Sequence, residues 1–364
     1  MTKKPRAYLF VGGGTGGHLY PAIAIAEQIR ARQPDSLIRF VCSNRPIDAK
    51  ILTDAGEDFV AIDACPMGRS FGAITRFIKG WRSSYKQSRA LIYELLPTRD
   101  VIVVAMGGFV APAPAWAAKR MRVPVVLVNL DAVPGKANLL IARFANRVCT
   151  ALPVSTKRWQ VLGPIVRESA KGTREQGIKA FGLDDAKQAL LVTGGSQGAQ
   201  SINEFMCAMV GSFPQAFDGW QIIHQTGEDE SNLASVYECA GITAWVNPYI
   251  EHMGDAWGCA DLTIGRCGAG TVSEAWASRV PAAFFPYPFH KDQHQKHNAM
   301  PMVNAGAAVL FEDFVDPAQN INAHGQQLAA ILSSPDQLAS MLGGFDAMGS
   351  TDGAGAAARL LVGF

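Results

Sequence analysis

Twice along this chain, a short apolar run is followed at once by a glycine-rich turn and then by a helical pattern. Near the start, the run 7–11 leads into the glycines of 12–17 and a helix expected over 21–31, and the same order returns from 189 to 209. A buried strand, a turn that lets main chain approach a ligand, and a helix form the first unit of a doubly wound sheet. The recurrence therefore predicts an α/β fold with two Rossmann-like domains.

The length of the chain agrees with two domains. With 364 residues, of which 48% are hydrophobic and 18% charged, this is an ordered globular protein too long for one usual core. We expect an N-terminal domain over 1–165 and a C-terminal domain over 166–345, with their loops facing across a cleft. The net charge of +2 is too small for general nucleic-acid binding, so no nucleic-acid partner is expected.

Cysteine usage and apolar segments indicate a cytoplasmic protein. The seven cysteines are widely spaced without a Cys-x-x-Cys, which is typical of reduced, mostly buried thiols rather than disulfides or a zinc site. The segments 7–26 and 101–118 contain no acidic residue, lysine or arginine, and in this they are similar to an export signal or a membrane span. Glycines interrupt both, and prolines the second, so strands, turns and helices explain them better.

The first glycine turn ends in a histidine, His18. Dinucleotide sites also use such a turn, but they place an acidic residue after the second strand, where this chain has Ser43 and Asn44. The dipole at a helix start pushes a histidine pKa toward the neutral form, which keeps the ring available as a base or a neutral donor. The alternative is a loop histidine bonded to main chain.

Further polar and glycine residues follow later strands of the first half. Met106–Phe109 forms a second glycine turn, and Asn129 and Asp131 follow the next strand. Ligands of open parallel sheets collect at the carboxyl edge, so these residues and the His18 turn are predicted to face one cleft. Asp131 is a candidate general base or acceptor ligand, and turn chemistry alone would also explain it.

The stretch 265–298 has the densest functional pattern. A glycine turn delivers the chain to a helix expected to start at Thr271, and its amides would favour negative charge or hydroxyl oxygens. Glu274 could accept hydrogen bonds from a ribose diol or complete a capping box with Thr271, and the two roles are compatible. Polar side chains crowd the loop 291–298, which suits a hydroxyl-rich ligand.

The segment 69–89 interleaves basic residues with an apolar stripe at positions 74, 77, 78, 81 and 85. Two interpretations are open. The segment could be an interfacial helix that meets anionic lipid head groups. It could also be a surface helix that packs its stripe on the sheet, and we expect packing to account for most of the stripe. The basic excess still favours an anionic surface nearby.

Several motifs together resemble one family. Their order and spacing are similar to those of the MurG family of transferases, and they cover nearly the whole chain. The motifs are Gly13–His18 with Pro21-Ala22, Met106–Gly108, Gly163–Arg167, Gly194–Ala199, His224–Gly227, Thr271–Glu274 and His290-Lys-Asp-x-x-Gln-x-x-Asn298.

The resemblance implies a GT-B fold in which the second domain holds most of a UDP-sugar and the C-terminal helix, in 346–364, packs back on the first domain. It places Ile250 main chain and Arg167 at uracil, and Glu274 at ribose. It places Gly195 and Ser196 near the diphosphate, Ala269, Thr271, His294 and Gln295 by phosphate and sugar, His18 at the acceptor, and Thr15, Gly16, Gly17 and Asn129 among further substrate-binding residues.

The chain also departs from the family pattern. Where the family has His-Glu-Gln-Asn, this sequence has Val128-Asn-Leu-Asp131. His294 replaces a glutamine, Gly270 a bulkier residue, and Phe109 a tyrosine. Most of these changes fall on acceptor and sugar positions and leave the nucleotide positions largely intact.

The implied activity is an inverting transfer of a sugar, most simply N-acetylglucosamine, from a UDP-sugar to a lipid-linked muramyl peptide at the inner face of the cell membrane. His18 is the first candidate for the base and Asp131 the second. No cofactor is expected, and a metal is not required because helix-start amides can neutralise the leaving group and no Asp-x-Asp is present. The alternatives are a transferase with another acceptor, a UDP-sugar epimerase, a non-catalytic nucleotide-sugar binder and an NAD-dependent oxidoreductase, which lacks its acidic ribose ligand here.

Overall fold

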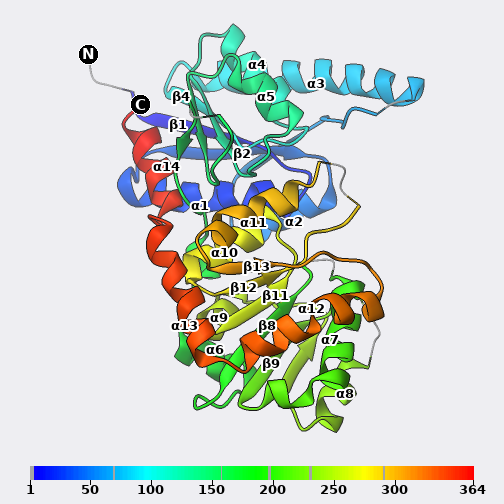
Figure 1. Ribbon diagram of the computed structural model, residues 1–364. Coiled ribbons are helices and arrows are strands. Elements are labelled where there is room, and N and C mark those ends of the chain that lie inside the picture. Colours follow the sequence, from blue (N-terminus) through cyan, green and yellow to red (C-terminus); the bar gives the residue numbers. More distant parts are fainter. Residues whose placement is uncertain (1–3, 69, 157, 196–197, 229–231, 290–291) are drawn as a thin grey trace. The chain divides into compact units, whose positions relative to one another are not determined.

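The chain divides into two compact units. A computed structural model describes residues 4–364 except 69, 157, 196–197, 229–231 and 290–291. Unit 1 consists of residues 1–167 and 352–364, and unit 2 of residues 168–351. Each unit is an α/β structure with its own parallel sheet (Figure 1).

The sheet of unit 1 has seven parallel strands in the order β3-β2-β1-β4-β5-β6-β7. The first strand lies between β2 and β4, and its last residue, Val11, pairs with Val41 on one side and Ala105 on the other. The strands are β1 (Arg6–Val11), β2 (Leu37–Ser43), β3 (Phe59–Ile62), β4 (Asp100–Ala105), β5 (Val125–Asn129), β6 (Arg147–Thr150) and β7 (Gln160–Val161).

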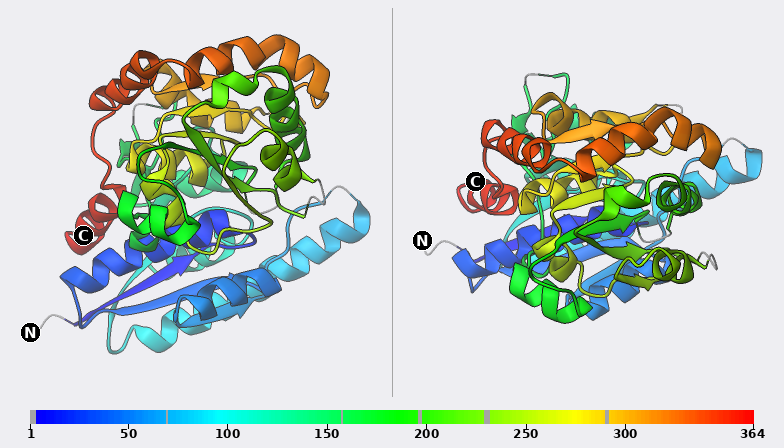
Figure 2. Two further views of the ribbon diagram at one scale, coloured as in Figure 1. Left: turned by 90° about the horizontal axis from the view of Figure 1, so that it is seen from below. Right: turned by 60° about the horizontal axis from the view of Figure 1, so that its bottom comes forward.

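Two groups of helices accompany this sheet. One group packs around α1, which contacts α2 and the C-terminal α14, and Figure 2 shows α1 and α14 side by side. In the other group α4 contacts α3 and α5. The helices are α1 (Gly16–Arg32), α2 (Pro46–Asp54), α3 (Phe71–Leu95), α4 (Pro112–Arg120), α5 (Lys136–Ala142) and α14 (Gly353–Val362).

The sheet of unit 2 has six parallel strands in the order β10-β9-β8-β11-β12-β13. Its first strand in the chain, β8, again lies between two later ones, β9 and β11. The strands are β8 (Gln188–Thr193), β9 (Trp220–Gln225), β10 (Ala244–Asn247), β11 (Leu262–Gly265), β12 (Ala282–Phe284) and β13 (Ala308–Leu310).

Helices of unit 2 also form two groups. The helix α9 contacts α6 and α10, and α10 contacts α11, whereas α7 contacts α8 and α12 and α12 contacts α13. These helices are α6 (Arg174–Phe181), α7 (Gln200–Ser212), α8 (Leu233–Cys239), α9 (Met253–Cys259), α10 (Ala269–Ser278), α11 (His294–Asn304), α12 (Pro317–Leu332) and α13 (Pro335–Gly344), with short 3-10 turns at Glu168–Ala170, Pro214–Phe217 and Phe345–Ala347. The expected pair of Rossmann-like sheets is confirmed.

The central strands read as continuous apolar runs because helices cover both faces of a doubly wound sheet. In β4, every residue from Val101 to Ala105 is buried, and Leu190–Val192 in β8 are fully buried. All seven cysteines are free, and four of them are buried.

The expectation that the apolar stripe of the 69–89 segment packs on the sheet is wrong for its first part. In α3 the buried residues are instead Gly80, Ser84, Ser88, Leu91, Ile92 and Leu95. Small residues allow close approach: a Cβ on Gly80 would lie 2.6 Å from the carbonyl oxygen of Asp63. The side chains of Ile74 and Ile78 are 38% and 44% exposed. No helix in the described part of the chain is long and apolar enough to cross a membrane.

Glycine also permits the close packing of α6 on α9 in unit 2. A Cβ on Gly177 would collide with the carbonyl oxygen of Asp255 and with the side chain of Cys259, whereas a Cβ on the helical Gly211 would meet nothing within 4 Å. Gly177→Ala is therefore expected to destabilise unit 2 by about 1–3 kcal/mol through overpacking. Gly211→Ala, in the last turn of α7, is expected to be neutral or to stabilise by up to about 1 kcal/mol, because alanine has a higher helix propensity than glycine.

Chemical denaturation followed by circular dichroism compares the two variants. An equal stability of the Gly177→Ala and Gly211→Ala proteins would contradict this account of the α6–α9 contact.

Candidate functional site

Each sheet has one topological switch point, and glycine turns occupy both. In unit 1 the turns after β1 and β4 lie next to each other because β1 and β4 are paired, and in unit 2 the same holds for the turns after β8 and β11. Ligands of open α/β sheets bind outside the carboxyl ends of the strands at such a point.

The turn after β1 carries His18 into the first turn of α1. Gly13 and Gly14 have φ angles of +151° and +89°, which residues with a side chain rarely adopt. The Gly12 amide donates to the carbonyl oxygen of Val41, which fixes the turn to β2. Thr15 is the N-cap of α1, and its hydroxyl oxygen lies 3.4 Å from His18 Nδ1. Thr15 and Gly17 are exposed and Gly16 is partly exposed at this helix start.

The half-buried imidazole of His18 is held in its neutral form. Burial lowers the pKa of His18 below its usual 6.5, while the negative charges of Asp131 and Asp48 act in the opposite direction and raise it. The effect of burial is the larger one, so the pKa of His18 is lower than usual and the unprotonated ring is favoured near neutral pH. A neutral imidazole can accept a proton, as a general base must.

Asn129 is fully buried at the end of β5. Its Nδ2 donates to Thr150 Oγ1 at 2.9 Å and to the main-chain oxygen of Asp131 at 2.6 Å, and its Oδ1 accepts from Asn138 at 2.8 Å. The amide of Asn129 therefore fixes the main chain that carries Asp131. Asp131 itself is partly exposed, and its charge acts on His18.

Arg167 is the last residue of the first segment of unit 1. Its guanidinium lies over the ring of Tyr20 in α1, 3.9 Å from the ring centre, which is a cation–π contact. The side chain of Arg167 thus packs on α1, the helix that carries His18.

In unit 2, the turn after β8 is stabilised by its own strand. The Gly195 amide donates to Thr193 Oγ1 at 3.1 Å, and this hydroxyl in turn donates to Gln225 Oε1 at 2.8 Å. Gly195 has φ of +81°, so glycine is favoured there. The predicted diphosphate ligand Ser196 lies outside the described residues.

The helix after β11 begins earlier than expected. Gly268 is the N-cap of α10, and Ala269 is its first residue, so the expected start at Thr271 is wrong by two positions. Glu274 lies in the second turn, so the Thr271–Glu274 capping box is wrong too. Small residues before Thr271 continue the helix into the turn, and no apolar periodicity marks this start. Instead Glu274 Oε2 accepts a hydrogen bond from Trp257 Nε1 at 2.9 Å, which orients its carboxylate.

Two further predicted residues lie at the start of α11. His294 Nδ1 lies 2.9 Å from Asp292 Oδ1, and Gln295 Oε1 accepts from the Tyr287 amide at 2.9 Å. The oxygen of Gln295 is thus engaged by protein, and its NH₂ group is the part able to donate to a ligand. Ile250, which precedes α9, has a buried side chain, so only its main chain is suited to a ligand contact.

A charged network that was not predicted from the sequence lies beside the turns of unit 2. Arg266, within the turn after β11, donates to Asp313 Oδ2 at 2.6 Å and to Ser201 Oγ at 2.9 Å. Burial alone would raise the pKa of Asp313, but hydrogen bonds from Ser201 and the Val315 amide, with the Arg266 charge, hold it below its usual value. The available signal was a single arginine inside a glycine turn, because Asp313 is distant in sequence.

No three His, Cys, Asp or Glu side chains gather as a metal site anywhere in the part of the chain that the structure describes.

Both halves of the chain match domains of one known protein family. The glycosyltransferase family 28 N-terminal domain matches residues 8–150, and the glycosyltransferase family 28 C-terminal domain matches residues 189–345. A protein of Halothermothrix orenii is 34% identical over 84% of this chain and 85% of its own length. It is named UDP-N-acetylglucosamine–N-acetylmuramyl-(pentapeptide) pyrophosphoryl-undecaprenol N-acetylglucosamine transferase.

Solved structures of MurG and of another sugar-nucleotide enzyme have the same fold as this chain. The MurG crystal structure of Acinetobacter baumannii has a TM-score of 0.75 and 26% identity over 99% of this chain and 100% of that one. The UDP-GlcNAc 2-epimerase of Neisseria meningitidis has a TM-score of 0.65 over 99% of this chain and 98% of that one, but at 12% identity it supports the GT-B fold alone. The chain therefore belongs to glycosyltransferase family 28, and within it to the MurG family that its motifs resemble.

Proposed function

We propose that this protein transfers N-acetylglucosamine from UDP-N-acetylglucosamine to a lipid-linked N-acetylmuramyl pentapeptide in peptidoglycan synthesis. The observation that carries the proposal is the 34% identity, over most of both chains, to a relative named for that transfer. The glycine turns at both switch points agree with it, because they offer main-chain amides where nucleotide and sugar oxygens bind.

The donor is proposed to bind unit 2. The carboxylate of Glu274, oriented by Trp257, would accept hydrogen bonds from the ribose hydroxyls. Main chain at Ile250 would meet the uracil, and the family resemblance assigns Arg167 to the uracil as well. Gly195, Ser196 and the first amides of α10 would face the diphosphate. Ala269, Thr271, His294 and Gln295 would lie by the phosphate and the sugar.

The acceptor is proposed to bind unit 1. Neutral His18 takes the proton of the acceptor hydroxyl, whose oxygen attacks the anomeric carbon from the face opposite UDP. The bond between that carbon and the UDP oxygen breaks, and helix-start amides stabilise the charge on the departing UDP. Thr15, Gly16 and Gly17 would contact the acceptor at the start of α1, and Asn129 acts through the position of Asp131.

His18→Ala tests the assignment of the base. Loss of a general base is expected to lower kcat by about 10²–10⁴-fold. Because burial lowers the pKa of His18 from its usual value, activity of the unaltered enzyme is expected to fall as the pH is lowered and His18 becomes protonated, at a lower pH than for an ordinary histidine. This acid limb should be absent in the variant. Initial rates with UDP-N-acetylglucosamine and a lipid-linked acceptor across pH give both results.

Calorimetry with UDP is the control, since the donor is proposed to bind the other unit and its affinity should persist in His18→Ala. Full transfer by this variant would refute the role of His18. Asp131→Asn separates the two candidates for the base. If His18 is the base, removal of the Asp131 charge, which raises the pKa of His18, should only move the acid limb to lower pH. If Asp131 is the base, its loss should abolish most activity.

Incubation with UDP-N-acetylglucosamine alone, followed by sugar analysis, separates transfer from epimerisation. Binding of the donor without turnover on any acceptor would instead favour a non-catalytic binder, and a titration with NAD tests the oxidoreductase alternative.

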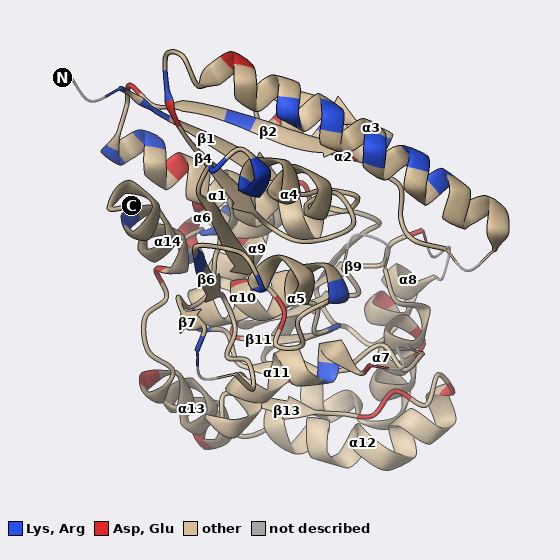
Figure 3. Cartoon of the chain, turned by 90° about the horizontal axis from the view of Figure 1, so that it is seen from above, with Lys and Arg blue, Asp and Glu red and all other residues tan. Residues whose placement is uncertain are grey.

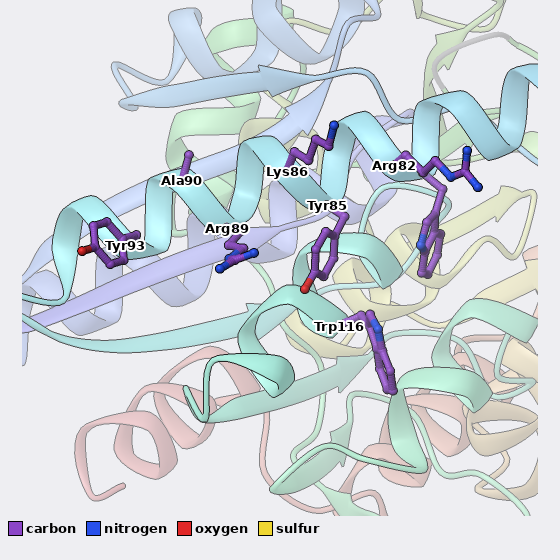
Figure 4. Close-up of a pocket in the computed structure, with 8 residues that line it drawn as sticks. Arg82, Tyr85, Lys86, Arg89, Ala90, Tyr93 and Trp116 are labelled. Carbon is purple, nitrogen blue, oxygen red and sulfur yellow. The ribbon is translucent and has the colours of Figure 1, made fainter.

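We also propose that unit 1 attaches peripherally to the cytoplasmic face of the membrane through α3. A groove of about 960 Å³ runs along this helix and is lined by aromatic and basic side chains (Figure 4). Its lining consists of Trp81, Arg82, Tyr85, Lys86, Arg89, Ala90, Tyr93 and Trp116. Figure 3 shows the row of basic residues along α3. Near the start of the helix, Phe71 is 84% exposed.

This composition fits an anionic lipid surface, because aromatic rings with polar tips settle at a membrane interface and basic residues attract its head groups. Each Lys or Arg near such a surface contributes about 1 kcal/mol.

The double variant Arg82→Glu/Lys86→Glu is therefore expected to weaken binding to vesicles that contain anionic lipid by roughly 25-fold or more. Lys179→Glu/Lys187→Glu in unit 2 changes the net charge equally and serves as the matched control. Vesicle sedimentation at two salt concentrations measures both. Equal weakening by the two double variants would show a general charge effect and contradict a site on α3.

A further inference from the structure

We infer that Asp48 and Arg45, at the start of α2, are positioning residues that hold the His18 turn in its working geometry. The inference rests on the proposed role of His18 as the base. Neither residue belongs to a glycine motif, and neither was among the site residues expected from the sequence.

Asp48 holds the turn by accepting hydrogen bonds from the main-chain amide of Gly14. The carboxylate is fully buried, and the Gly14 amide donates to both of its oxygens, at 2.7 and 2.9 Å. The same carboxylate accepts from the Ser43 amide at 3.0 Å and from the Ser43 hydroxyl at 2.6 Å. Asp48 thus joins the turn after β1 to the end of β2. Hydrogen bonds to a charged acceptor are stronger than those between neutral groups.

Arg45 contacts the other main-chain polar group of Gly14, its carbonyl oxygen. Its guanidinium donates to the carbonyl oxygen of Gly14 at 2.8 Å, and it lies 5.0 Å from the centre of the Phe109 ring. The Phe109 ring also covers Gly14, where a Cβ would collide with it. Both main-chain polar groups of Gly14 are therefore engaged by α2, and the turn after β4 covers the residue.

The position of His18 depends on the path of the turn, because His18 follows Gly14 by only four residues. Glycines offer no side chains that could fix the turn, so the amide and carbonyl contacts are what define its path. The turn after β4 fits closely against the imidazole, since a Cβ on Gly108 would lie 3.2 Å from His18 Cε1. A shift of the turn would therefore displace the base from its neighbours.

Charge gives this arrangement a second effect. Among the described residues of unit 1, the charged groups that act on His18 or contact the turn are Asp48 and Arg45 at the start of α2 and Asp131 after β5. Arg167 lies over the ring of Tyr20 in α1, and residues 106–109 of the turn after β4 carry no charged side chain. The negative charge of Asp48 raises the pKa of His18 against the larger lowering by burial. Removal of that charge should therefore lower the pKa further.

Asp48→Asn tests the inference in the full-length enzyme. The amide keeps the size of the side chain, removes its charge and sets an NH₂ group against donors. We expect kcat to fall about 10- to 100-fold, because small misplacements of a catalytic group have effects of this size. The KM for UDP-N-acetylglucosamine should stay unchanged, and the acid limb of the pH–rate profile should move to lower pH. A purely structural role would not move that limb.

Asp63→Asn is the matched control. Asp63 also lies in unit 1 and accepts hydrogen bonds from Asn44, Ser83 and Gln87, but no hydrogen bond joins it to the turn. Its substitution should leave kcat and the acid limb unchanged.

Arg45→Met keeps the inference testable if Asp48→Asn fails to fold. Its exposed side chain should tolerate the change, and loss of its bond to Gly14 should lower kcat with unchanged donor KM. Wild-type kcat in folded Asp48→Asn or Arg45→Met protein would overturn the inference. If His18→Ala also kept full activity, the proposed base would fail instead, so the two failures are distinguishable.

Discussion

Both units depend on one constraint of parallel sheets. At one place in such a sheet, the connections from two adjacent strands run to opposite faces of the sheet. No connection covers the carboxyl end of the strand there. β1 and β8 hold this place in their sheets. The main chain leaving such a strand must satisfy its own amides and carbonyls. Glycine turns that lead into helix starts meet this need and leave some amides directed to a ligand, so both candidate sites lie where the topology allows them.

Glycines have no side chains that could fix the conformation of a turn, so other residues must do so. The residues that fix the glycine turn come from different elements in the two units. In unit 1 the support comes from the neighbouring helix start, through Asp48 and Arg45 on Gly14. In unit 2 it comes from Thr193, the last residue of the preceding strand, through the Gly195 amide. Binding geometry in each unit therefore depends on side chains that need not touch a ligand.

Local patterns predicted the strands, the glycine turns and the family, because apolar runs and glycines act over a few residues. Contacts between distant segments were not predictable in this way. Asp48 sits in a polar stretch after β2 with no motif, and its buried role appears only when that stretch lies beside Gly14. The buried residues of α3 were also missed, because Gly80, Ser84 and Ser88 pack closely without being hydrophobic, whereas the predicted stripe was chosen by hydrophobicity.

The departure from the family at the end of β5 has a physical basis in the burial of residue 129. The family's run has a glutamate there, whereas Asn129 lies among neutral partners, Thr150 and Asn138. An unpaired carboxylate at a fully buried position would cost several kcal/mol, roughly as much as a broken buried ion pair. A neutral amide avoids that cost and fixes Asp131 instead. The ionisable chemistry of this edge is then concentrated in Asp131 and His18, so the balance between burial and two nearby carboxylates sets the protonation of the proposed base.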